Sequence, residues 1–147
     1  MDSLKSLFGI GSSSHEKLTL QDNDLGTFTA LNNSESRIIW NGSADFMGEK
    51  VSLIIHGEKD KLDDSQKESV MTILKNEKKI ELEIDRSLKE QYDNANKEYS
   101  NWKTLFKCIS ISSSEHDINI TMEEKDSFHN FNIQFKDNKA IDVSIDS

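Results

Sequence analysis

Residues 126–147, DSFHNFNIQFKDNKAIDVSIDS, carry the clearest structural pattern in the chain. Aromatic and aliphatic residues alternate with polar residues over positions 131–135 and again over positions 141–145. A period of two is typical of strands with one buried face. Asp137-Asn138-Lys139 lies between the two runs and has the composition of a tight turn. The stretch therefore predicts a β-hairpin, which opens with the step Asp126-x-x-His129.

The middle of the chain, residues 63–101, has a different period. Apolar residues recur three or four positions apart, which predicts amphipathic helices. Ser65-x-x-Glu68 reads as a capping box at the start, and Asn76 interrupts the run, so we expect two helices. The apolar stripe consists of Val70, Ile73, Leu74, Ile80, Ile84, Leu88, Tyr92, Ala95, Tyr99 and Trp102.

Strand patterns flank the helices on both sides, over residues 25–58 and 104–146. In the first set, Asn41-Gly42 and Met47-Gly48 are rival turns, and we prefer Gly48 because it leaves strands of more even length. In the second set, Ile109 and Ile111 are expected on one face. Strands, then helices, then strands predict an α+β domain. Its mostly antiparallel β-sheet would carry the central helical pair packed on one face.

The chain of 147 residues is long enough for one domain. Residues 1–24 are interpreted as a flexible leader, because a Gly/Ser-rich stretch follows its few apolar residues. Residues 25–147 are expected to form the single α+β domain. Its core should include six residues that lie on apolar stripes: Ile84, Leu88, Phe131, Ile133, Phe135 and Val143.

The charge balance limits the classes of partner. The formal net charge is −9, and acidic residues exceed basic ones along the whole chain, which argues against nucleic acid and against anionic membranes. Cys108 is the single cysteine and is expected to be a small buried hydrophobic residue. The apolar stretch Leu4–Ile10 is too short and too interrupted for an export signal or a membrane span, so we expect a cytoplasmic protein.

Asp126 and His129 form the one acid–histidine pair of interest. A carboxylate can orient an imidazole and raise its basicity. No nucleophile accompanies the pair, so we interpret both residues as structural. His15, His56 and His116 are scattered and lack metal-ligand spacing, and no phosphate-binding loop is present. We therefore predict no metal, no cofactor and no catalytic residue.

Acidic loop residues are the candidates for a binding surface. Asp63, Asp64, Glu123 and Glu124 have no evident partner in the sequence and could meet a basic protein. Trp102 is the aromatic candidate, because tryptophan is favoured at interfaces. Its helical spacing favours a core position over a surface one.

Short motifs occur at the start, in the first strands and at the end of the expected domain. Together they resemble a family of small bacterial domains of unknown function, over about residues 25–145. The motifs are Leu25-Gly26-Thr27-Phe28, then Trp40 with Gly48 and Val51–Ile55, then Asp126, His129, Phe135 and Lys139.

The resemblance implies a role as an immunity protein. Members of that family are often encoded near polymorphic or contact-delivered toxins, and some are suspected immunity proteins. The family usually has Gly after the His, where this chain has Asn130. The resulting hypothesis is a non-enzymatic cytoplasmic protein-interaction domain, an immunity protein that binds and neutralises a basic toxin domain. One alternative is a small-molecule-binding or hydrolytic domain that uses Asp126 and His129. Another is a domain of the same fold with a purely structural role inside a larger assembly.

Overall fold

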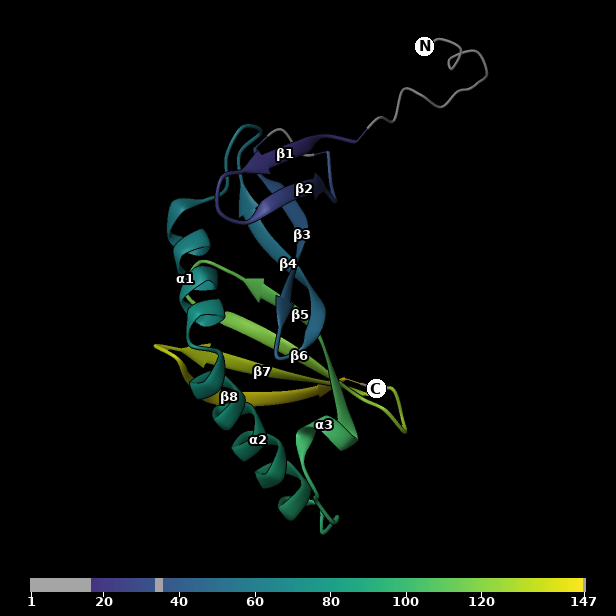
Figure 1. Cartoon of the computed structure of the whole chain (residues 1–147). Coiled ribbons are helices and arrows are strands. Elements are labelled where there is room, and N and C mark those ends of the chain that lie inside the picture. The colour runs from purple at the N-terminus through teal and green to yellow at the C-terminus, as the bar shows by residue number, and fades with distance from the viewer. Residues whose placement is uncertain (1–16, 34–35, 147) are drawn as a thin grey trace, which may run out of the picture.

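The computed structural model describes residues 17–33 and 36–146. These residues contain an 8-stranded sheet in which the spatial order of the strands follows their order in the chain (Figure 1). The helices come after β4 and before β5 in the sequence. The strands are β1 Thr19–Asp22, β2 Gly26–Ala30, β3 Ile38–Phe46, β4 Glu49–Gly57, β5 Phe106–Ser113, β6 Ile118–Glu124, β7 Asn130–Lys136 and β8 Lys139–Asp146. The helices are α1 Asp64–Lys75, α2 Glu77–Asn94 and α3 Trp102–Leu105.

The change of period along the sequence correctly predicted an α+β fold with a mostly antiparallel sheet. Six of the neighbouring strand pairs are antiparallel, and only β4 and β5 run parallel. A parallel pair requires a crossover, and α1 to α3 supply it. Helix α1 contacts β4 and β5, whereas α2 contacts β8 and α3. The packing of both helices on one face of the sheet stays a prediction.

The turn between β3 and β4 lies at Met47-Gly48, as predicted. Both residues have positive φ, 54° and 82°, which is the backbone that two-residue hairpin turns favour. The rival Gly42 lies inside β3 instead. A Cβ atom on Gly42 would come within 2.7 Å of the Phe28 ring, so this glycine admits the close approach of a buried aromatic side chain.

The predicted start of the first helix needs a correction. Asp63, not Ser65, is the N-cap of α1, and its carboxylate accepts the backbone N–H of Gln66 at 3.0 Å. Gln66 is buried and does not return a capping bond. Its side-chain oxygen accepts instead from the His56 N–H and the Ser113 hydroxyl, at 3.0 and 2.8 Å. These bonds fix α1 against β4 and β5, which is why the helix begins two residues early.

The second helix ends at Asn94, earlier than the predicted residue 101. Asn96 adopts a left-handed backbone with φ of 56°, and the chain leaves the helical path there. Tyr99 and Trp102 still reach the core, from the connection and from α3. Tyr99 and Trp102 are therefore spaced like core residues of a helix, although α2 does not extend to them.

Strand β5 of the second set departs from simple alternation. In β5 the register shifts between Cys108 and Ser110, so Cys108 and Ile111 are buried while Ile109 is half-buried. The prediction that Ile109 and Ile111 share a face was wrong, because a bulge re-aims the side chains on one side of it. Burial raises the pKa of the Cys108 thiol to about 12, as expected for a buried thiol.

The N-terminal part of the sheet begins before the expected boundary at residue 25. Strand β1 pairs with β2 from Thr19 to Asp22, within the stretch that was interpreted as a leader. The Asp22 carboxylate lies 3.1 Å from Lys67 Nζ on α1, which ties this strand to the helix. The remainder of the leader, residues 1–16, lies outside the described residues.

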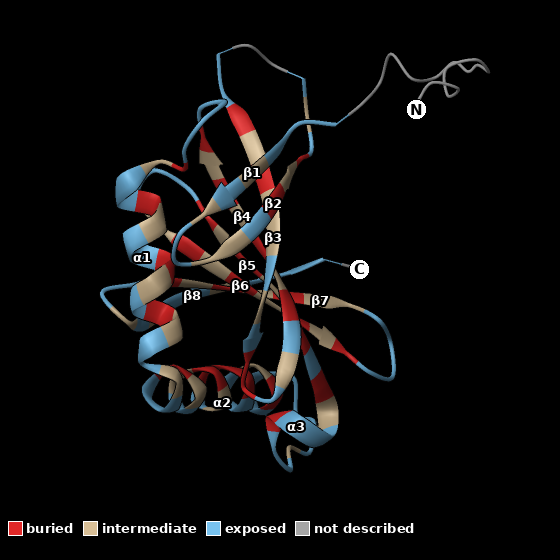
Figure 2. Ribbon diagram, turned by 45° about the horizontal axis from the view of Figure 1, so that its top comes forward, coloured by how far each residue is buried: buried red, intermediate tan, exposed pale blue. Residues whose placement is uncertain are grey.

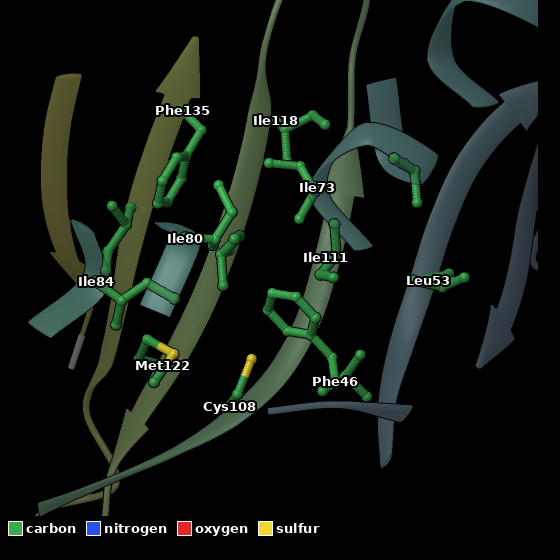
Figure 3. Packing of buried hydrophobic residues seen from close by; sticks show 14 of the residues in the cluster. Phe46, Leu53, Ile73, Ile80, Ile84, Cys108, Ile111, Ile118, Met122 and Phe135 are labelled. Carbon is green, nitrogen blue, oxygen red and sulfur yellow. The ribbon is translucent and has the colours of Figure 1, made fainter. Parts of the chain in front are cut away.

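The hydrophobic core combines buried residues of the strands and of the helices, and buried positions recur along α1 and α2 (Figure 2). Figure 3 shows Ile73, Ile80 and Ile84 of the helices among side chains of β5 to β7. Of the six predicted core residues, five are buried and Val143 is partly buried against the same cluster. Within residues 17–33 and 36–146, no helix has the length and apolarity needed to cross a membrane.

Candidate functional site

The step Asp126-x-x-His129 forms the turn between β6 and β7. Two backbone bonds close it: Glu124 N–H donates to the His129 carbonyl, and Phe128 N–H donates to the Glu124 carbonyl, both at 2.8 Å. Lys125 N–H donates to the Leu105 carbonyl at 2.9 Å. The turn is therefore closed on itself and fastened to the end of α3.

A buried carboxylate organises this turn. Glu124 is only 4% exposed, and its Oε1 accepts the Ser127 hydroxyl at 2.5 Å. Its Oε2 accepts the Tyr92 hydroxyl from α2 and lies 3.4 Å from Lys97 Nζ. His129 Nδ1 lies 4.0 Å from Oε1. One side chain thus joins the second helix, the following connection and the turn.

The environment of Glu124 keeps it ionised. Burial alone would raise the pKa of this carboxyl, but hydrogen bonds from Ser127 and Tyr92 and the charge of Lys97 outweigh it and hold the pKa below the usual 4.5. Burial, followed by the hydrogen bond to Glu124, raises the pKa of Tyr92. An ionised carboxylate that holds several donors is a weak base and a firm structural anchor.

Asp126 and His129 do not form the acid–histidine pair that the sequence suggested. No hydrogen bond or ion pair joins Asp126 to His129, and the acid nearest the imidazole is Glu124. Ser127 donates to the carboxylate and accepts the His129 backbone N–H at 3.2 Å. A nucleophilic triad needs the hydroxyl bonded to the imidazole, and this arrangement bonds it to the acid. The residues of the motif therefore shape the turn.

The turn displays a phenylalanine that the sequence reasoning missed. Phe128 has a φ of 63° and is 71% exposed. A left-handed backbone at a bulky residue is uncommon. The available signal was its position, because Phe128 is out of phase with the buried alternation of Phe131, Ile133 and Phe135. An apolar residue out of phase with its strand belongs to the other surface.

Glu124 also had a signal in the sequence. Ile118, Ile120 and Met122 are buried and alternate along β6, and Glu124 is the next residue in phase. The prediction that Glu124 is a surface loop acid was wrong, because the strand continues through it and turns its side chain inward.

The other predicted acidic residues do not gather on one surface. Asp63 caps α1 and lies 3.8 Å from Arg37, while Asp64 is exposed beside Lys61 at 3.3 Å. A hydrogen bond from the Gln66 N–H and one from the Ser65 hydroxyl lower the pKa of Asp63. Asp63 and Asp64 lie at the start of α1, where Gln66 bonds to Ser113 at the end of β5. Ser113 is paired with Ile118, the first residue of β6. Glu123 lies near the other end of β6, opposite Lys107 of β5.

Trp102 is buried, at 3% exposed, and is not a surface anchor. Its indole N–H donates to Glu81 at 2.9 Å, and its backbone N–H donates to Asp85 at 3.1 Å. The residue lines an open groove of about 490 Å³ between α2 and α3, which also includes the exposed Leu82. Trp102 thus belongs to the hydrophobic core and borders the groove.

No cluster of three or more histidine, cysteine or acidic side chains suited to a metal ion occurs in the described ranges 17–33 and 36–146. The chain matches no protein family, no curated protein and no solved structure. The resemblance to the bacterial domains near toxin genes therefore stays an expectation from the motifs.

We predict that Glu124→Gln lowers the free energy of unfolding at neutral pH by about 1–3 kcal/mol, because the charge-assisted bonds from Ser127, Tyr92 and Lys97 are lost or weakened. The pKa of Glu124 is lowered in the folded state, so its contribution is present above pH 4.5 and disappears as the pH falls through the folded-state pKa. The difference between wild type and variant should therefore shrink on acidification. Denaturant titrations from about pH 7 to about pH 3 measure it.

Glu123→Gln is the matched control, because Glu123 is adjacent and forms none of the side-chain contacts of Glu124. We expect it to change the free energy of unfolding by less than about 0.5 kcal/mol. A Glu124→Gln difference that is constant over the whole pH range would show that the charge of Glu124 does not stabilise the fold.

Proposed function

We propose that the protein is a non-enzymatic interaction domain that binds a partner protein through the turn carrying Phe128. The observation that carries the proposal is the exposure of this ring on a strained backbone. A non-glycine residue with positive φ costs on the order of 1–3 kcal/mol and persists only where the surroundings impose it. Exposed aromatic side chains are frequent anchors of protein interfaces.

The surroundings of Phe128 support an anchor that is organised before binding. Glu124 bonds to Ser127, the residue before Phe128, and lies near His129, the residue after it. The backbone bonds of the turn leave the segment little freedom. A residue fixed in its binding conformation loses less entropy when the partner binds. The contacts of Glu124 with Ser127, Tyr92 and Lys97 would thus hold Phe128 in position.

The charge of the chain favours a basic partner. A net charge of −9 attracts a cationic protein over distances up to the Debye length, about 8 Å at physiological ionic strength. Together with the motif resemblance, this suggests an immunity protein in the cytoplasm that binds a basic toxin domain and covers its active site. The proposal includes α1 and α2 as a pair that covers one face of the sheet.

The contacts of Asp126, Ser127 and His129 do not support the alternative, a small-molecule-binding or hydrolytic domain. Its two residues, Asp126 and His129, are not bonded to each other, and the hydroxyl of Ser127 is held by Glu124. None of the four hollows described on the surface is lined by Ser127 or His129.

The variant Phe128→Asn tests the anchor. Asparagine tolerates a left-handed backbone better than phenylalanine, so we expect the free energy of unfolding to stay equal or rise. Loss of an aromatic anchor should weaken binding of the partner at least about thirtyfold, the equivalent of a 2 kcal/mol hot spot. Immobilised protein would retain the partner from a lysate of the source cells, and the purified partner would then be titrated against both forms.

Leu82→Asn provides the control, since Leu82 is 72% exposed on α2 and is as apolar as the proposed anchor. We expect it to bind like the wild type. The association rate with the partner should also fall as salt rises from about 50 mM to about 500 mM. Equal binding by Phe128→Asn and wild type would refute the anchor, and an acidic partner whose association ignores salt would refute the charge argument.

A further inference from the structure

A hollow of about 410 Å³ opens at one end of the sheet, between α1 and two turns. Its walls come from three segments that are far apart in the sequence: residues 69–73 of α1, residues 116–118 where β6 begins, and residues 135–138 where β7 ends. The turn between β7 and β8 lies beside α1 in both views of the chain (Figure 1, Figure 2). The volume falls within the range of small-molecule sites, about 300–1,000 Å³.

The inner wall of the hollow is apolar. Ile73, Ile118 and Phe135 line it and are only 2%, 6% and 2% exposed. Ile118 and Phe135 are paired across β6 and β7, and Figure 3 shows Ile73 of α1 next to Ile118. A ligand in the hollow therefore meets an apolar surface at its inner end.

The outer wall carries charges of both signs. Asp117 and Asp137 supply two carboxylates, and Lys136 supplies an ammonium group. Within residues 17–33 and 36–146, none of these three side chains forms a hydrogen bond or an ion pair. Their charges are therefore available to a ligand.

Neutral polar side chains complete the wall, namely Ser69, Thr72, His116 and Asn138. The Thr72 hydroxyl donates to the Glu68 carbonyl at 2.9 Å, which leaves its oxygen free to accept. The Asn138 amide can both donate and accept. The hollow thus offers donors and acceptors of hydrogen bonds over a small area.

We propose that the hollow binds a free α-amino acid with an apolar side chain. A ligand with only a carboxylate meets two carboxylates in the wall, and a ligand with only an ammonium group meets Lys136. A zwitterion matches both signs, because its ammonium group can bind an aspartate while its carboxylate binds Lys136. Its apolar side chain leaves water and packs against the inner wall.

The site is separate from the proposed anchor. Phe128 lies in the turn that joins the end of β6 to the start of β7, whereas the hollow lies at the start of β6 and the end of β7. The 7 residues of β6 separate the two places by about 20 Å. Binding of the amino acid and binding of a partner protein can therefore each fail without affecting the other.

Titration of the full chain with L-leucine and L-phenylalanine, followed by amide chemical shifts, tests the site. We expect saturable binding with a Kd at or below about 1 mM, and the largest shift changes in residues 69–73, 116–118 and 135–138. N-acetyl-L-leucine lacks the ammonium group, L-leucinamide lacks the carboxylate and glycine lacks the apolar side chain, so each should bind at least about tenfold more weakly. L-leucine should also raise Tm, because a ligand that binds only the folded chain stabilises it.

Two variants remove the charges of the wall. Asp117→Asn/Asp137→Asn retains the shape of both side chains, and asparagine tolerates the left-handed backbone at position 137, where φ is 53°. Lys136→Gln removes the ammonium group. Each variant should weaken binding of L-leucine at least about tenfold and leave urea unfolding of the free chain unchanged.

Asp142→Asn is the matched control, because Asp142 is an exposed carboxylate that does not line the hollow. It should bind L-leucine like the wild type. The inference is overturned if neither amino acid binds up to about 10 mM, or if N-acetyl-L-leucine binds as tightly as L-leucine. Shift changes confined to other residues, or an equal loss of binding in the control, also overturn it.

Discussion

Replacing Trp40 by alanine is expected to lower the free energy of unfolding by about 3–5 kcal/mol, the usual range for a buried aromatic side chain. Trp40 is 0% exposed and lies on β3 between Ala30 of β2 and Ile55 of β4. Its indole N–H donates to the Glu58 carbonyl at 2.9 Å. The alanine variant would leave a cavity within the first half of the sheet and an acceptor without its donor. Urea unfolding followed by far-UV circular dichroism measures the effect.

Trp40→Phe separates the two contributions. The variant retains most of the ring but loses the N–H, so the expected cost is smaller, about 1–3 kcal/mol. If the alanine variant lost less than about 1 kcal/mol, the burial of Trp40 in the core would be contradicted, because that is the scale of substitutions away from the core.

The second large effect is expected for Phe135→Ala, again about 3–5 kcal/mol. Phe135 is 2% exposed on β7, where it lies between Ile118 of β6 and Ala140 of β8. Its removal would uncouple the C-terminal hairpin from Ile73 of α1, which lines the same hollow. Thermal and urea unfolding of the purified variant provide the measurement.

Phe128→Ala is the matched control, because it deletes the same atoms from an exposed ring. We expect a change below about 1 kcal/mol, since exposed side chains contribute little to stability. Equal losses for the two phenylalanine variants would mean that burial does not explain the effect at Phe135.

Local patterns predicted most of the fold. The period of two identified β6 and β7 and the buried Phe135, and the period of three to four identified both long helices and the break at Asn76. The errors lie where a distant contact changes a local preference. The cap moved to Asp63 because Gln66 bonds to two strands, and α2 stopped at Asn94 because the connection returns Trp102 to the core by another route.

The candidate site was predicted in part. The step Asp126-x-x-His129 was recognised as a turn, but its organising acid was not, because Glu124 was read as an exposed loop residue. The alternation of β6 already placed Glu124 in phase with Met122. Two partners of that carboxylate, Tyr92 and Lys97, lie far away in the chain, and no sequence spacing relates them to it.

The α+β order, the antiparallel hairpins, the central helices and the acidic charge follow from the amino-acid sequence, because each depends on periodicity, turn composition or a count of residues. The burial of Glu124, the left-handed backbone that displays Phe128, and the exposure of Ile141 and Ile145 on the last strand of the sheet become evident only in the folded chain. These features depend on which distant residues become neighbours. A periodic pattern specifies the face on which a residue lies, but the packing of the whole chain decides whether anything covers that face.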